Sequence, residues 1–574
     1  MIEESSIEEP QKGQSGAIPV VIAGAPESEQ EQLLPFIEGQ PGVVPEETTA
    51  SRRRVIAKSA TLVMLGNLGS SLIGMVRQIV VTSLGSSIAG PFNSALLTAQ
   101  TFNDFLVNGS VSGALIPTFN DYAAPERRLE LRRLVFTLVN IVILIMFAVA
   151  VIYAFVSPWF VNLLVQGYTG PQKLLTLQFS QIIFFSLVAL GPFSVLLSAL
   201  YALREFGWPA FATASYHVGI IIGAIVGSLV GERFYGHLGL AFGVLLGAAG
   251  EIALLLPGIR KQRLGYLFVL DLKHPALRRI LKLYAPVALS FLVSMGLVFL
   301  DQYFASLTPG GGAANYTAMR AATTLIQFPI GLVAAALSFA VLPMLSTYAT
   351  QGDSERFKET LLLGARLGLL LMIPAAAGLI VLRGPIVALL FQHHNYNAQD
   401  AARTAVALQN YAYQLPFVAL DQLLIAAFYA RKNTIIPVTV GFVCILGYLA
   451  VALPFRQSIG MPALAFANTV QNSLHGIILL VLLRIVMGPL NIRKTLPTLL
   501  KIVVAAVALV VVAWGLQVAL SHIALFSLDH LIGQLLTVLV AGGLASGAYL
   551  GVVLLLRVEE IGLVRDAVLA KLKR

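Results

Sequence analysis

The chain has 574 residues, of which 57% are hydrophobic and only 11% are charged. This composition excludes a soluble globular protein of this length, because its surface would need far more polar side chains. The net charge of +10 is spread between apolar segments and not gathered in a soluble domain, so it does not indicate nucleic-acid binding. The single cysteine, Cys444, excludes an internal disulfide.

The first fifty residues differ from the rest of the chain. They hold ten Glu and one Lys among scattered Pro, Gly, Gln and Ser, so residues 1–50 are predicted to be a disordered acidic tail. No apolar segment with a small-residue cleavage site follows Met1, so no signal peptide is predicted. Arg52, Arg53, Arg54 and Lys58 precede the first long apolar run and predict a cytoplasmic N-terminus.

Apolar runs of about 20 residues recur along the remainder of the chain, which is the length a helix needs to cross the hydrocarbon core of a bilayer. The sequence therefore predicts an all-α polytopic membrane protein with about fourteen transmembrane helices. The predicted spans lie near 60–83, 91–118, 134–156, 175–200, 211–230, 238–257, 282–306, 317–346, 361–382, 403–428, 435–454, 461–483, 498–520 and 531–556.

The basic residues between these spans alternate in the way that fourteen spans require. With the N-terminus inside, roughly 31 of the 38 Lys and Arg residues fall on cytoplasmic segments, as the positive-inside rule demands. Both termini are therefore predicted to be cytoplasmic, and the basic excess is explained by topology and anionic membrane lipids.

Short motifs recur in the same order in two parts of the chain. "LIPTFNDYA", ending at Ala123, returns as "VLPMLSTYA", ending at Ala349, so Pro117 corresponds to Pro343. Each repeat would hold six spans, and an even number gives both copies the same orientation in the membrane. We expect two pseudo-symmetric six-helix lobes facing a central cavity, at 51–260 and 261–490. Two extra helices and a basic cytoplasmic tail occupy 491–574.

Polar side chains interrupt the first two spans. Arg77, Gln78, Asn103, Asp104 and Asn108 lie inside apolar runs, where a charge costs roughly 2.5–3.5 kcal/mol on insertion scales. These residues are predicted to line a translocation cavity, with Asp104 paired to Arg77 as a gating or cavity pair. The alternatives are an Arg77 that snorkels to the interface and Asn residues that only hydrogen-bond neighbouring helices.

Two further acids fall in predicted spans. Asp421 is a candidate proton or cation site, with a local pair as the alternative, and Asp301 is a candidate gating or coupling residue that could instead face solvent. His393 and His394 are adjacent and lack further ligands at metal spacing, so no metal site is predicted.

Several of these segments resemble the MurJ (MviN) family of lipid II flippases, in the superfamily that also holds multidrug extruders and polysaccharide flippases. The resemblance rests on "SLIGMVRQIVVTSLG", "NGSVSGALIPTFNDY", "QFPIGLVAAALSFAVLPMLSTYA", "LLFQHHNYNAQDAARTAVAL" and "FYARKNTIIPVTV", and runs from about residue 58 to 560. It implies two six-helix lobes and a C-terminal helix pair that helps to form a groove for a polyprenyl tail. It also implies a bacterial plasma-membrane location and a polyprenyl-pyrophosphate-linked muropeptide as cargo.

The chain departs from the family pattern in its polar residues. The family's Arg-Asp pair reads Arg77-Gln78 here, and an upstream Arg corresponds to Ser71. The Arg pair and Glu of the second span correspond to Asn103-Asp104 and Asn108. An Arg of the eighth span corresponds to Thr324, and Arg320, one helical turn away, is predicted to supply the missing cation.

These observations predict a lipid II flippase that works by alternating access. The substrate-binding residues would be Arg77, Arg320, Asn103, Asn108 and Gln78, with Asp104, Asp421 and Asp301 serving in gating or ion coupling. No catalytic set, ATP-binding motif or cofactor is predicted, so Na⁺ or H⁺ coupling is a candidate drive. Two alternatives remain: a cation-coupled exporter of drugs or other lipid-linked oligosaccharides, and a transport-inactive scaffold that binds cell-wall synthesis proteins.

Overall fold

The structure, a computed structural model, describes residues 49–110, 114–232, 236–490 and 495–562. By its internal contacts the chain divides into Met1–Lys58 and Ser59–Arg574. The predicted acidic tail at 1–50 lies almost wholly outside the described residues. From Ser59 onward, the helices belong to the second unit.

In the part of the chain that the structure describes, every regular element is a helix. We refer to the helices from α3 to α10 as the first lobe. They are α3 (Thr49–Ser83), α4 (Ser86–Ser110), α5 (Ile116–Asn120), α6 (Arg128–Leu164), α7 (Gly170–Phe184), α8 (Leu187–Ala202), α9 (Pro209–Val230) and α10 (Gly239–Lys261), with short 3-10 turns η2 (Pro125–Arg127) and η4 (Gly236–Leu238).

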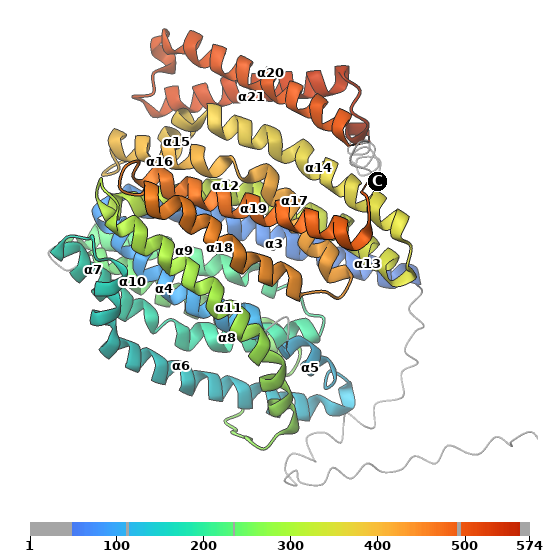
Figure 1. Ribbon diagram of the computed structural model, residues 1–574. Helices are drawn as coiled ribbons and strands as arrows, with labels where there is room; N and C mark the ends of the chain where they lie inside the picture. The colour runs from blue at the N-terminus through green and yellow to red at the C-terminus, as the bar shows by residue number, and fades with distance from the viewer. Residues whose placement is uncertain (1–48, 111–113, 233–235, 491–494, 563–574) are drawn as a thin grey trace, which may run out of the picture. The chain divides into compact units, whose positions relative to one another are not determined.

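The helices from α11 to α19 form what we call the second lobe, and two more helices come after it. They are α11 (Pro275–Leu307), α12 (Gly312–Ala340), α13 (Leu342–Gln351), α14 (Ser354–Val381), α15 (Arg383–Phe391), α16 (Ala398–Ala412), α17 (Leu415–Ala430), α18 (Ile435–Phe455), α19 (Met461–Met487), α20 (Leu496–Ser521) and α21 (Leu531–Leu555), with the turn η6 (Ala524–Phe526) between the last two. Figure 1 shows α20 and α21 beside α14.

Local sequence explains where many of these helices begin and end. Proline occupies the first turn of α5, α9, α13, α17, α19 and α20, where its missing N–H costs nothing. The side chain of Asp353 accepts a hydrogen bond of 3.0 Å from the N–H of Arg356 and caps α14. Gly352 ends α13 in the left-handed region, at φ 71°.

Within the described residues, ten helices are long and apolar enough to cross a membrane, or eleven if the bent pair α16–α17 counts as one span. The total of fourteen therefore stays a prediction. Three predicted spans, 175–200, 317–346 and 403–428, are each divided between two helices. The divisions fall between α7 and α8, between α12 and α13, and between α16 and α17, where the chain bends by 45°.

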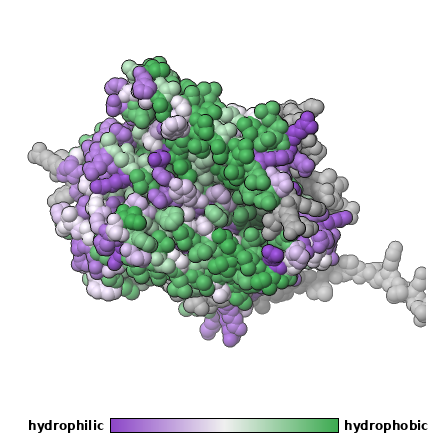
Figure 2. Space-filling view, turned by 45° about the horizontal axis from the view of Figure 1, so that its top comes forward, coloured by the Kyte–Doolittle hydropathy of each residue, from purple (hydrophilic) through white to green (hydrophobic). Residues whose placement is uncertain are grey.

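The exposed apolar side chains and the buried cores are typical of a membrane protein. Large apolar side chains such as Phe155 and Leu229 are more than 80% exposed. Figure 2 shows a broad hydrophobic area across the middle of one face, with hydrophilic residues gathered to its left and right. Two buried cores lie mainly in the first lobe, a third lies mainly in the second, and a fourth joins α20 and α21 to α14.

Glycines allow α9 and α10 to pack at very short range. A Cβ at Gly223 would lie 2.2 Å from the carbonyl oxygen of Gly239, and one at Gly219 would lie 2.3 Å from the backbone nitrogen of Gly247. Lipid provides no hydrophobic driving force for helix association, so the close packing that small residues permit stabilises the pair.

The two lobes contact each other where α3 ends and α4 begins, which we call the Gly85 end. The N–H of Asn395 donates a 3.1 Å hydrogen bond to the carbonyl of Ser83, and a Cβ at Gly90 would lie 2.7 Å from Ala313. At the opposite end, which we call the Asp121 end, Arg279 of α11 forms an ion pair with Asp121.

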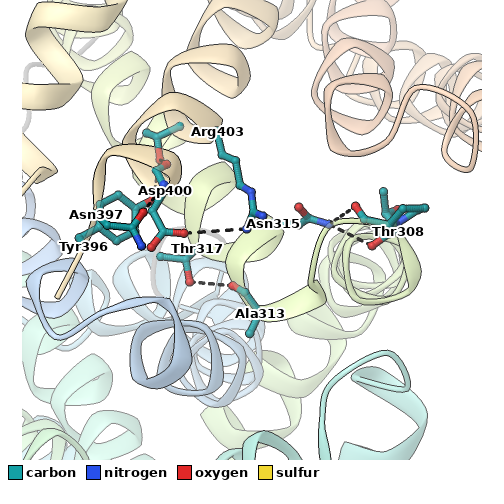
Figure 3. Close-up of polar contacts among 10 residues, drawn as sticks. Thr308, Ala313, Asn315, Thr317, Tyr396, Asn397, Asp400 and Arg403 are labelled. Atoms are coloured by element: carbon teal, nitrogen blue, oxygen red, sulfur yellow. Dashed lines mark hydrogen bonds and ion pairs between the residues drawn. The ribbon is translucent and has the colours of Figure 1, made fainter.

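Polar contacts hold the second lobe's loops in place at the Gly85 end (Figure 3). The amide of Asn315 donates to the carbonyls of Thr308 and Pro309, both at 3.0 Å, and so closes the turn from α11 to α12. The loop before α16 is fixed by a 2.6 Å bond between the hydroxyls of Tyr396 and Thr404. Burial raises the pKa of the Tyr396 phenol, so this bond stays neutral across the physiological pH range.

Candidate transport cavity

A cavity of about 830 Å³ lies between the two lobes. It is lined by α3 and α9 of the first lobe and by α11, α12, α17 and α19 of the second. The polar residues among its lining are Ser71, Arg77, His217, Arg320, Thr323, Thr324, Gln327, Gln414, Asp421, Gln422, Asn468 and Asn472.

Arg77 supplies one cation to this cavity from α3. Its side chain is only 6% exposed, so it is buried inside the protein and does not snorkel to a membrane interface. Its Nε and one terminal nitrogen have no hydrogen-bond partner among the described residues. Gly74, one turn earlier, makes room for a neighbour, because a Cβ there would lie 3.1 Å from Nε2 of His217.

Arg320 supplies a second cation from α12. It is half-buried, its Nε has no partner among the described residues, and it lies within electrostatic range of Arg77. Thr323 and Thr324 donate to its carbonyl oxygen at 3.0 and 2.9 Å, so Thr324 adds no free donor of its own. Two guanidinium groups that repel each other across a cavity favour an anionic occupant.

The wall formed by α17 and α19 carries amides and an acid. The amide of Asn472 donates to Oε1 of Gln414 at 2.5 Å and to Oδ1 of Asn468 at 3.0 Å, which joins the two helices. Asp421 lies 2.5 Å from Nδ1 of His475. Of the predicted residues, the structure thus brings Arg77, Arg320 and Asp421 to one cavity.

The other predicted residues whose side chains the structure describes do not line it. Gln78 is buried and donates to Thr82 of its own helix at 3.2 Å. Asn103 is half-buried on α4 with an Oδ1 that has no partner among the described residues, and Asp104 is exposed and acts electrostatically on Tyr216. The side chain of Asn108 lies outside the described residues.

Asp301 is not solvent-facing but is held by a second-lobe partner. The hydroxyl of Tyr448 in α18 donates to its carboxylate at 2.5 Å, which ties α18 to α11. The loop histidine His393 makes a 2.8 Å contact with the carbonyl of Leu389. Among the described residues, no group of three or more acids, histidines and cysteines has the geometry of a metal site.

Sequence reasoning missed His217, Gln414, Asn468, Asn472 and His475. A signal for three of them was present, because residues 468, 472 and 475 recur at helical spacing within one apolar run and so share a face. A polar stripe in a membrane helix marks a buried or functional face.

Two helical lobes with a polar cavity between them, on a chain whose helices are apolar outside, define a multi-pass membrane transporter. A model of the lipid II flippase MurJ family matches residues 80–532. The chain therefore belongs to the lipid II flippase MurJ family, whose members are multi-pass proteins of the bacterial inner membrane.

Known proteins resemble the chain along most of its length. It is 28% identical over 530 residues to a probable lipid II flippase MurJ of Bdellovibrio bacteriovorus, an alignment that covers 89% of this chain and 97% of that protein. It is 27% identical over 447 residues to a probable lipid II flippase MurJ of Vibrio cholerae, covering 75% of this chain and 82% of that protein.

Solved structures share the fold. A lipid II flippase MurJ in an inward closed conformation matches with a TM-score of 0.69 and 21% identity, over 86% of this chain and 98% of that one. An inward-facing multidrug transporter of the MATE family matches with a TM-score of 0.58 and 15% identity, over 73% of this chain and 94% of that one.

Proposed function

We propose that this chain is a lipid II flippase that moves a polyprenyl-pyrophosphate-linked muropeptide from the inner to the outer leaflet by alternating access. Family membership over residues 80–532 supports the cargo class. The observation that carries the proposal for this chain is the pair of guanidinium groups, Arg77 and Arg320, with unused donors on a shared cavity.

The chemistry of the cargo matches the polar groups of the cavity. A pyrophosphate cannot cross about 30 Å of hydrocarbon unaided. Guanidinium groups bind phosphate oxygens through paired, charge-assisted hydrogen bonds. Gln422 of α17 and Asn468 and Asn472 of α19 offer donors and acceptors for the sugar and peptide.

The polyprenyl tail would remain in the membrane while the head group uses the cavity. We assign the tail to the surface of α20 and α21 where these helices pack beside α14. Their outer side chains, such as Val511 and Leu539, are exposed and apolar. The tail thus keeps its lipid surroundings during transport, and only the head group needs a polar path.

The orientation of the chain follows from its charges. We infer that the Asp121 end, which carries most loop Lys and Arg residues, is cytoplasmic, and that both termini lie there. The contacts at the Gly85 end would then close the cavity toward the outer leaflet, and the head group would enter from the cytoplasm.

Two other functions give distinct expectations. A cation-coupled exporter of drugs or other lipid-linked saccharides needs an acid such as Asp421, Asp301 or Asp104 for Na⁺ or H⁺ and has little use for Arg77. A scaffold that recruits cell-wall synthesis proteins needs neither arginine.

Complementation tests the proposal. Depleting the resident lipid II flippase of a bacterial host and expressing this chain should restore arrival of lipid-linked muropeptide at the outer leaflet. Rescue should be lost in Arg77→Ala. Arg356→Ala, which changes an exposed arginine beyond the cavity, is the matched control and should rescue fully. Absence of rescue by the unchanged chain, at normal membrane levels, would contradict the proposed function.

A further inference from the structure

The cavity presents an electrostatic puzzle. Among the described residues that line it, Asp421 is the only carboxylate, and Arg77 and Arg320 carry unpartnered N–H donors. A carboxylate on the same cavity would ordinarily pair with such a donor and neutralise it. Among the described residues, Asp421 pairs with His475 and with neither arginine.

His475 of α19 holds that carboxylate. Oδ1 of Asp421 lies 2.5 Å from Nδ1 of His475, and both side chains are 14% exposed. Nε2 of the same ring lies 3.0 Å from the carbonyl oxygen of Pro437 in α18. Gly476 packs against α17, where a Cβ would lie 3.2 Å from the carbonyl oxygen of Phe417, and Gly441 lies beside Nε2 of His475.

The bonding pattern fixes the number of protons on the pair. A carbonyl oxygen only accepts, so Nε2 must carry a hydrogen and donate it to Pro437. Nδ1 and Oδ1 then need one further proton between them, either on the imidazolium or on the carboxylic acid. Without that proton the neutral ring carries a hydrogen on only one nitrogen, so it loses either the Pro437 contact or the Asp421 contact.

We propose that His475 is a positioning residue that sequesters Asp421, so that Arg77 and Arg320 stay available to the anionic head group of the transported lipid. This inference rests on the proposed function for the class of its ligand. Because the two ring contacts together need that proton, its loss weakens the hold on Asp421, and head-group binding is linked to proton binding. When the proton leaves and the remaining ring hydrogen stays on Nε2, Asp421 loses its donor and becomes a competing anion in the cavity.

The charged surroundings of the pair are consistent with this role. Asp421 and His475 act on each other, and Asp421 also acts on the thiol of Cys444 in α18. Arg77, Arg320 and His217 face the same cavity. On the neighbouring helices, Asp301 of α11 accepts from Tyr448 and also acts electrostatically on Arg320, and Arg366 of α14 pairs with Glu560 at 3.0 Å.

Binding measurements on a set of variants test the proposal. The full chain in lipid nanodiscs is titrated with farnesyl pyrophosphate, a short polyprenyl pyrophosphate, by calorimetry, and inorganic pyrophosphate serves as the tail-free arm. His475→Ala frees Asp421 and should weaken binding about tenfold or more in both arms. His475→Ala combined with Asp421→Asn removes the freed charge and should return the Kd to within about threefold of the wild-type value.

The pH profile provides a readout that a purely structural role would not move. Wild-type affinity should fall as pH rises through the titration of the pair, with a limiting slope of one proton, about tenfold per pH unit. In Asp421→Asn the proton-linked fall in affinity should be absent, so any remaining pH dependence comes from titration of the probe itself. His475→Gln keeps a donor toward Asp421, so it should bind well but without the proton-linked slope.

His522→Ala, at an exposed histidine just beyond α20, is the control and should match the wild type throughout. Unchanged affinity in His475→Ala, or failure of Asp421→Asn to restore it, would overturn the inference while leaving the proposed function intact. An effect limited to farnesyl pyrophosphate would assign it to the tail and also overturn it. A wild-type chain that binds neither probe would contradict the proposed function and, with it, this inference.

Discussion

Arg77 is buried on a helix that the sequence places in the membrane, and its guanidinium lacks partners for two of its nitrogens among the described residues. Such a group is unfavourable unless something fills its hydrogen-bonding capacity for part of the cycle. A phosphate that arrives and leaves would do so. The unpartnered donors of Arg77 therefore support a role for the cavity in transport.

Substitutions at Arg77 should separate charge from geometry. Arg77→Lys keeps the cation but loses the planar fork, so lipid flipping in proteoliposomes should fall about tenfold, and Arg77→Ala should fall about a hundredfold. Flipping is followed by chemical quenching of a fluorescent lipid-linked substrate. Equal rates in Arg77→Ala and the wild-type chain would remove Arg77 from the site.

Tyr448 gives a prediction about stability. Its hydroxyl donates to Asp301 at 2.5 Å, and Tyr448→Phe leaves a half-buried carboxylate without that donor. The free energy of unfolding should fall by about 1–3 kcal/mol, seen as a lower Tm in detergent. Tyr413→Phe removes a hydroxyl from a side chain that is 41% exposed and should leave the Tm unchanged. A Tm that does not move in Tyr448→Phe would mean that water replaces the phenol.

At the scale of elements, helix pairs are fixed by contacts that hydropathy does not report. The α9–α10 pair depends on glycines whose missing Cβ atoms let the backbones approach, and its geometry follows from residue size alone. The breaks at α7–α8 and α16–α17 are likewise invisible to hydropathy. The backbone N–H and C=O groups that lose their helical partners at a break are satisfied inside the protein. The sequence can therefore stay apolar across the break, and hydropathy does not detect it.

Gly223→Ala should loosen the α9–α10 pair. The added Cβ would lie 2.2 Å from the backbone oxygen of Gly239 and 2.6 Å from Gly243, so the helices must separate. We expect a loss of about 1–3 kcal/mol, measured as a lower Tm. Gly543→Ala, in α21, is matched in chemistry and meets nothing within 4 Å, so it should be neutral or slightly stabilising. Equal Tm values for the two variants would contradict this account of the pair.

At the scale of the whole molecule, alternating access requires that the contact at the Gly85 end open and close. Ser83→Cys combined with Asn395→Cys, in a Cys444→Ala background, places two thiols where the lobes share a 3.1 Å backbone hydrogen bond. Oxidation should lock that end and abolish flipping, and a reductant should restore it. Each single cysteine variant should flip normally under both conditions. Undiminished flipping in the oxidised, cross-linked protein would show that this end does not move.

The sequence by itself determined the class of the protein, because the hydrophobic effect and the cost of charge in hydrocarbon act on composition and order along the chain. The repeated motifs also lie on matching elements: Pro117 is in the first turn of α5 and Pro343 in the first turn of α13, and each of these short helices follows a long one, although the sequence predicted both prolines inside long spans. Arg77, Arg320 and Asp421 were identified because an ionisable residue inside an apolar run is conspicuous wherever it points.

Only the tertiary structure decided what those residues do to one another. In the sequence Gln78 is as conspicuous as Arg77, but its side chain donates to Thr82 of the same helix. His475 was not predicted to be a site residue, yet from α19 it contacts Asp421 of α17. The reason is geometric: the direction of a side chain is set by how helices pack, and packing depends on glycine contacts and helix breaks spread over the chain. The tertiary structure thus decided which polar groups share the cavity, and it leaves donors of Arg77 and Arg320 available to an anion.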